Sequence, residues 1–209
     1  MVTRSYLGVR RNYKRIPRKM KDKIIQIGNT LWSSENFKEL QFANGEVIPL
    51  ASSKEEWMKA SRNHAPCAWE MNGHVYYNHY IFNIDDGIIP KGYRMPSDKD
   101  WKVLMSNLED QYGPGWNVAG KALSARRGEF NIGFHNVWGG KLQSHTAYAF
   151  ADFVNEQSEA SYYWTRTESY DQQARSFYLN KKTKEFDISS SPRGCGMLVR
   201  LICEDGEFK

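Results

Sequence analysis

Residues 90–101 (PKGYRMPSDKDW) contain the clearest helix start in the chain. Ser97 is a favourable N-cap, and Asp100, at the third helical position, suits the reciprocal hydrogen bond of a capping box. The apolar residues that follow recur at i, i+3, i+4 and i+7, which is one face of an amphipathic helix: Trp101, Leu104, Met105 and Leu108. Gly113-Pro114 ends this pattern. The stretch therefore predicts a helix that Trp101 anchors to a sheet.

Two shorter helices are expected on either side of this one. Ser53 and Glu56 form a second capping-box pattern, and Trp57 and Ala60 follow on one helical face. After the main helix, residues 118–123 fit a further short helix.

The remaining pattern is rich in β-forming residues and turns. An apolar run over 24–27 leads into a Gly28-Asn29 turn. The expected strands cover residues 30–32, 45–48, 74–82, 162–164, 175–179, 185–189 and 197–203. In the last of these, Met197, Val199, Leu201 and Cys203 share one face. Residues 124–160 indicate a long irregular region, and the whole order predicts an α+β fold, because strands and helices do not alternate as in βαβ repeats.

Charge divides the chain into a basic arm, residues 1–23, and a domain, residues 24–209. Residues 1–25 carry nine Lys or Arg and one acid, a net charge of +8, which leaves −3 for the remainder of the +5 total. Two interpretations stay open: a solvated tail, or an arm that docks on an acidic protein or nucleic-acid surface. The residues expected to dock are Arg10, Arg11, Lys14, Arg15, Arg18 and Lys19.

Composition narrows the class of protein. Aromatic residues make up 14% of the chain, enough for a substantial core around loops. Three cysteines, Cys67, Cys195 and Cys203, do not make a disulfide framework; buried free thiols are the preferred interpretation, and a single bridge of undetermined pairing stays open as the alternative. The sequence has no apolar run of about 18 residues that would span a membrane, and no signal peptide is visible.

Seven short motifs in order resemble the Fibrobacter succinogenes major paralogous domain, a branch of the C-type-lectin-like superfamily. The resemblance covers residues 24–204, and the block at 89–101 and the closing block weigh most. The motifs are Leu31–Phe37, Gly73–Asn78, Ile89–Trp101, Ala119–Leu123, Gly133-Phe134, Tyr163–Glu168 and Gly196–Ile202.

This resemblance implies a C-type-lectin-like fold with two helices, small antiparallel sheets and long irregular loops. It also implies a ligand surface on the last loops and the C-terminal hairpin, where Tyr and Arg favour recognition of a glycan or a protein. The expected binding residues are Tyr162, Arg166, Glu168, Tyr170, Gln172, Arg175, Tyr178, Asn180 and Lys181, with Gln173 beside them. Arg200 is expected on the face opposite Met197, where it pairs with an acid or binds loop carbonyls.

The sequence patterns do not point to catalysis. The Glu-Pro-Asn and Gln-Pro-Asp signatures of calcium-dependent sugar binding are absent. His64, Cys67, His74 and His79 match no zinc spacing, and the cysteines lack an activating context. We therefore expect no enzyme activity, no metal and no cofactor.

Three settings for a binding module remain. The preferred one is a phage virion, with the arm docked on a structural subunit, because the family is typically exported and no leader is visible. The second is an exported cell-surface protein whose leader was removed. The third is a nucleic-acid-binding accessory that uses the arm, with salt-sensitive binding.

Overall fold

The structure is a computed structural model that describes residues 23–83, 87–114, 117–142 and 159–204. Almost all of the basic arm lies outside these ranges. The elements in chain order are β1 (Ile24–Ile27), β2 (Thr30–Ser33), α2 (Lys54–Arg62), β3 (Ala68–Met71), β4 (His74–Tyr77), the 3-10 helix η1 (His79–Asn83), β5 (Tyr93–Arg94), α3 (Asp98–Tyr112), α4 (Val118–Ser124), β6 (Ala160–Glu168), β7 (Gln173–Asn180), β8 (Phe186–Pro192) and β9 (Ile202–Cys203). This arrangement confirms the α+β class, with three α-helices among the described residues.

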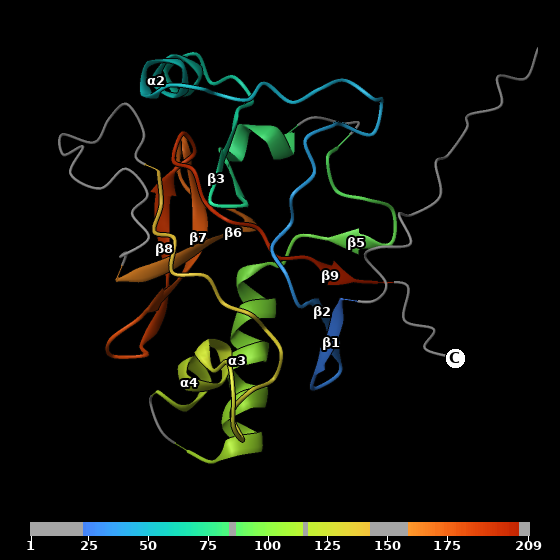
Figure 1. Ribbon diagram of the computed structural model, residues 1–209, viewed down its shortest axis with the longest axis vertical. Coiled ribbons are helices and arrows are strands. Elements are labelled where there is room, and N and C mark those ends of the chain that lie inside the picture. Colours follow the sequence, from blue (N-terminus) through green and yellow to red (C-terminus); the bar gives the residue numbers. More distant parts are fainter. Residues whose placement is uncertain (1–22, 84–86, 115–116, 143–158, 205–209) are drawn as a thin grey trace, which may run out of the picture.

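Helix α3 stands between the two larger sheets (Figure 1). It begins as predicted, because the Ser97 hydroxyl accepts from the Asp100 backbone N–H and the Asp100 carboxylate accepts from the Ser97 N–H. Its four predicted apolar residues are all buried. Arg94 adds two hydrogen bonds to the Asp100 carboxylate, at 2.7 and 2.8 Å, so β5 is tied to the start of the helix.

Helix α2 also begins where predicted, with one difference at its cap. Ser53 accepts a hydrogen bond from the Glu56 N–H, but the Glu56 carboxylate accepts from the backbone and hydroxyl of Ser52 instead of from Ser53. In a capping box the carboxylate would bond the N-cap residue, Ser53, but here it bonds Ser52, the residue before the N-cap.

The described strands form three small antiparallel sheets. Their orders are β1-β2-β9-β5, β3-β4 and β6-β7-β8. The turn predicted at Gly28-Asn29 joins the antiparallel strands β1 and β2, and the strands predicted over 175–179 and 185–189 pair as the β7-β8 hairpin. In the three-stranded sheet, Tyr163 pairs with Phe177 and Phe177 with Ile188, so one face presents large apolar side chains to α3.

The prediction of one strand over 74–82 is wrong in its second half. β4 ends at Tyr77, and His79–Asn83 forms the 3-10 helix. The Asn78 side chain turns back to bond the Cys67 N–H and the Ala65 carbonyl, while the His79 N–H donates to the Arg193 carbonyl. These bonds take the backbone out of the β3-β4 ladder.

The predicted closing strand over 197–203 is also too long, since only Ile202 and Cys203 belong to β9. The preceding residues are extended but pair singly with different segments, Met197 with Tyr77 and Leu198 with Tyr163. No one neighbour runs alongside them for long enough to make a ladder.

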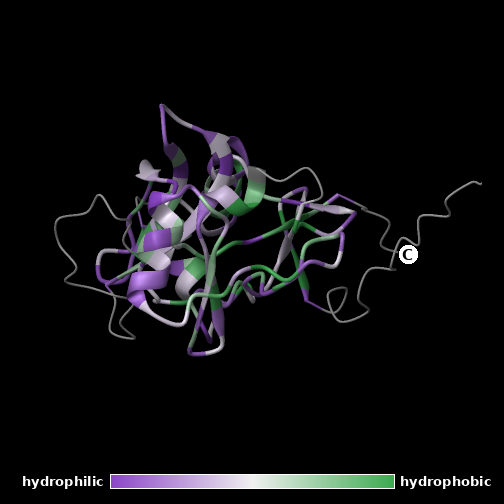
Figure 2. Ribbon diagram, turned by 90° about the horizontal axis from the view of Figure 1, so that it is seen from above, coloured by the Kyte–Doolittle hydropathy of each residue, from purple (hydrophilic) through white to green (hydrophobic). Residues whose placement is uncertain are grey.

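The predicted alternation of faces in this segment is nevertheless confirmed. Met197, Val199 and Leu201 belong to one apolar cluster, whereas Leu198 and Ile202 belong to the other, around Trp101. The segment therefore separates two parts of the core, and Figure 2 shows hydrophobic residues along the extended segments through the middle of the molecule.

Arg200 is the charged residue of this central segment and is fully buried. Its guanidinium lies over the Phe134 ring, 4.2 Å from the centroid, and donates to the carbonyls of Ser33 and His135, each at 3.0 Å. Of the two roles expected for Arg200, the structure shows the bonding of loop carbonyls.

Candidate binding site

A bulge in β6 changes the direction in which the end of this strand presents its side chains. The pairing with β7 is regular up to Trp164 and resumes at Glu168. Between them, the Arg166 N–H donates to the Pro96 carbonyl at 2.9 Å, and the Thr165 hydroxyl donates to the Asp98 carboxylate at 3.0 Å. The strand is thus joined to the start of α3 instead of to its hairpin partner, as bulges near functional sites often are.

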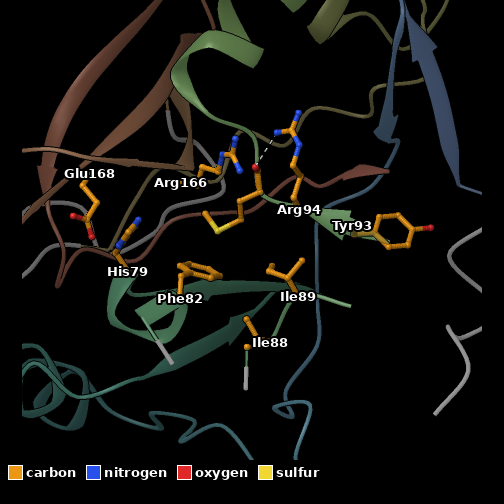
Figure 3. Close-up of a pocket in the computed structure, with 10 residues that line it drawn as sticks. His79, Phe82, Ile88, Ile89, Tyr93, Arg94, Arg166 and Glu168 are labelled. Carbon is orange, nitrogen blue, oxygen red and sulfur yellow. Dashed lines mark hydrogen bonds between the residues drawn. The ribbon is translucent and has the colours of Figure 1, made fainter. Parts of the chain in front are cut away.

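The bulge borders a cavity of about 310 Å³ between η1, β5 and β6. Figure 3 shows Arg94 and Arg166 on one side of it and Phe82, Ile88 and Ile89 on the other, with His79 and Glu168 together at one end. Met95 and Tyr93 add further apolar surface. This combination of apolar walls and a few charged groups is typical of a ligand site.

His79 lies at the inner end of the cavity and is almost fully buried. Its Nε2 lies 3.1 Å from the Thr165 carbonyl, so this nitrogen carries the proton and donates it. Burial lowers the pKa of His79 to about 4, so the ring is neutral at pH 7. Its Nδ1 is then an acceptor, and it has no hydrogen-bond partner among the described residues.

Some of the charged side chains around the cavity already form ion pairs with other residues of the protein, and others do not. Glu168 binds the Arg193 guanidinium at 3.0 Å, but its side chain remains 69% exposed. Arg94 is held by Asp100 and Glu204. Arg166 is exposed, and no ion pair holds its guanidinium within the described residues. Arg166 is therefore the cation most available to a ligand.

The structure divides the predicted binding residues into separate groups. Arg166 and Glu168 line the cavity, and two others lie at the same end of the hairpin. Tyr170 is 87% exposed, and the Gln172 side chain accepts from the Tyr80 hydroxyl at 3.3 Å. These four residues can belong to one surface.

A second group lies at the opposite end of the same sheet. The rings of Tyr162 and Tyr178 are 5.1 Å apart, and the Lys141 ammonium lies 4.9 Å from the centre of the Tyr162 ring. Asn180 donates to the Tyr178 hydroxyl at 2.8 Å, and Lys181 follows at the start of the turn. These residues are separated along the strand from the cavity.

Arg175 belongs to neither group, because its side chain supports the fold. Its Nε binds the Asp98 carboxylate at 3.1 Å and its Nη1 donates to the Ser190 hydroxyl. Gln173 donates its backbone N–H to the Tyr170 carbonyl and so closes the hairpin turn.

Most of the cavity was not anticipated from the sequence. Its apolar wall comes from Phe82 and from residues 87–95, which carry no binding signature. The part that the sequence did indicate is Arg166 and Glu168, two charged residues that are exposed at the end of β6, whereas residues 160–165 of the same strand are buried or half-buried.

Other predicted features carry less information here. The docking residues Arg10 to Lys19 lie outside the described residues, so arm docking stays a prediction. In the described part of the chain, no group of three or more His, Cys, Asp or Glu side chains is placed to hold a metal ion.

The three cysteines are free, and burial raises the pKa of the Cys67 thiol to about 11. Among the described residues, no helix combines the length and apolar character needed to cross a bilayer.

Comparison with known proteins gives one result. A family model described as the Fibrobacter succinogenes major domain matches residues 25–202. No curated protein and no solved structure matches the chain.

Proposed function

We propose, from the premise that the chain belongs to the Fibrobacter succinogenes major domain family, that it is a non-enzymatic binding module with a C-type-lectin-like fold. The observation that carries this proposal is the cavity beside the β6 bulge, where an apolar wall faces exposed charge. A module of this kind serves adhesion or display, in which the ligand is held and not transformed.

The chemistry of the cavity supports binding over catalysis. Its histidine is neutral and fixed by a backbone carbonyl, and among the described residues no Ser or Cys lines the cavity with it. Cys67 lies elsewhere, and its raised pKa keeps it a thiol at neutral pH, whereas a nucleophile needs a thiolate.

Of the two ligand classes expected, the cavity favours a protein. Phe82, Ile88 and Ile89 offer aliphatic and aromatic surface to an apolar side chain, while Arg166 and Glu168 can pair with polar groups at the rim. A buried apolar centre with a charged rim is the usual arrangement of a protein interface.

The test uses small probes of each class with the full-length chain. N-acetyl-leucine amide represents a peptide side chain with its flanking amides, and methyl glucoside represents a glycan. Methyl NMR spectra should show that the amide, at millimolar concentration, shifts the methyl signals of Ile88, Ile89 and Met95. The glycoside should leave them unchanged, and the amide should be recovered unaltered.

The matched variants are Ile89→Arg, which fills the cavity, and Val103→Arg, which makes the same change on the exposed side of α3. Only Ile89→Arg should abolish the shifts. Shifts that survive in Ile89→Arg, or that appear only with the glycoside, would contradict a protein-binding cavity.

A further inference from the structure

A second cavity, with no lining residue in common with the first, has a different chemical character. It encloses about 330 Å³, at the small end of the range for ligand pockets, which suits one sugar or one small acid. Its walls are almost entirely polar: Glu35, Asn36, Lys38, His74, Arg126, His135 and Val137.

The electrostatics of this cavity favour an anion. Lys38 and Arg126 line it, and within the described residues neither forms an ion pair with a carboxylate. The one acid, Glu35, is already bound by the Lys23 ammonium, and this bond lowers the pKa of Glu35. Burial lowers the pKa of His74, and the charges of Lys38, Arg200 and Arg126 lower it further against the opposite effect of Glu35.

Several of these groups are held in place by the fold. Arg126 donates to the Asn136 carbonyl at 2.9 Å, which fixes the guanidinium beside the cavity. His135 has a φ of 51°, in the left-handed region that non-glycine residues rarely adopt, and Arg200 holds its carbonyl. An unfavourable backbone conformation kept in place by a buried arginine is typical of a functional position.

Polar atoms without partners border the same cavity. Asn36 is 7% exposed, and neither its amide nitrogen nor its amide oxygen has a hydrogen-bond partner within the described residues. The Nδ1 of His74 is in the same condition. Buried polar atoms in this state are costly and call for an explanation. Because the terminal torsion of asparagine is broad, the amide can turn toward a ligand at little cost.

We propose that this cavity binds a singly charged carboxylate that carries neighbouring hydroxyl groups, as in a hexuronic acid. Lys38 and Arg126 bind the carboxylate. Asn36 and His74 supply donors and acceptors for the hydroxyls. The Glu35 carboxylate accepts from hydroxyls and repels a dianion, which distinguishes this ligand from a phosphate ester.

Calorimetry with the full-length chain tests the proposal using three probes. Galacturonate should bind at least about tenfold more tightly than methyl galactoside, which lacks the charge, and than acetate, which lacks the hydroxyls. Binding should weaken between about 50 and about 500 mM salt, because part of it is electrostatic. Trigalacturonate shows the source of the ligand: tighter binding than galacturonate indicates a polysaccharide, and equal binding a free acid.

Matched variants locate the site. Lys38→Gln and Arg126→Gln should each weaken galacturonate binding about tenfold, and Arg127→Gln, the same change at the next residue, should not. Lys38 is exposed, so its variant should fold even if Arg126→Gln does not. The proposal is overturned if galacturonate binds no better than methyl galactoside, or if folded Lys38→Gln binds as the unchanged protein does. The cavity at Ile89 is a separate site, so this outcome does not bear on it.

Discussion

The rings of Trp101 and Phe177 stack face to face, with centroids 4.0 Å apart and planes inclined by 8°. Both side chains are fully buried, one on α3 and the other on β7. The same Trp101 ring lies 4.9 Å from Trp32 of the four-stranded sheet. One side chain of the main helix therefore contacts both larger sheets.

Phe177→Ala should lower the free energy of unfolding by about 3–5 kcal/mol, because it leaves a cavity where Trp101 now stacks. Urea denaturation of the two proteins measures the difference. Tyr170→Ala removes an exposed aromatic residue from the turn between β6 and β7 and should change stability by less than about 0.5 kcal/mol. Equal losses of unfolding free energy in both variants would show that the stacked pair stabilises the fold no more than an exposed aromatic residue does.

Gly120→Ala should destabilise the protein although alanine favours helices. A Cβ atom at this position would lie 1.9 Å from the backbone oxygen of Lys184, so α4 or the β7-β8 turn must move. We expect a loss of about 1–3 kcal/mol. Lys121→Ala, at the next and exposed position of α4, should be close to neutral in the same thermal denaturation experiment. A stable Gly120→Ala variant would show that the helix shifts at no cost.

Arg200→Met keeps the length of the side chain but leaves the carbonyls of Ser33 and His135 without their donor. The loss of donors to one buried and one part-buried acceptor should cost about 2–4 kcal/mol in urea denaturation. The variant should also bind galacturonate more weakly, since His135 loses the bond that fixes its backbone. If the variant is less stable but binds galacturonate as strongly as the unchanged protein does, Arg200 contributes to stability and not to galacturonate binding.

The acid sensitivity of the protein should depend on His79. Burial places the pKa of His79 at about 4 in the folded state, against 6.5 for the free side chain. Below pH 6.5 the unfolded chain therefore binds a proton that the folded chain does not, and stability falls until about pH 4. His79→Gln should flatten the pH dependence of the urea midpoint between pH 7 and pH 4. Parallel curves would contradict this assignment.

Asp100 acts at lower pH and through a different cause. Burial alone would raise the pKa of Asp100, but its bonds from Arg94 and Ser97 prevail and lower it from 3.8 to about 2. The stabilisation is present above pH 4 and is lost as the pH falls toward 2, with a size of roughly 2 kcal/mol. Asp100→Asn should therefore be less stable than the unchanged protein at pH 6, and this difference should vanish near pH 2.

The parts of the fold that the sequence predicted well are those specified by local contacts. Ser97 and Asp100 lie three residues apart, and the apolar face of α3 follows from spacing alone. The 74–82 and 197–203 strands were overextended because their ends depend on distant residues. The Asn78 side chain bonds the backbone near Cys67, and Met197 and Leu198 pair with two different segments.

The candidate sites were harder to predict for the same reason. The sequence predicts that the binding residues of the hairpin form one surface. The antiparallel register instead places Arg166 and Tyr178 at different ends of the sheet. The polar cavity is built from two connecting segments and β4, so Asn36, His74 and Arg126 show no common motif in the sequence.

The segment that separates the two apolar clusters is the last described stretch of the domain to leave the ribosome. Until residues 196–203 emerge, Tyr77, Tyr163 and Leu142 lack the backbone partners that residues 196–198 supply, and both clusters stay open on one side. The earlier hairpins and α3 can form during synthesis, but the core cannot close around them. Folding of this domain is therefore completed only after translation of its final strand, and a ribosome that stalls before that strand holds a chain with exposed apolar surface.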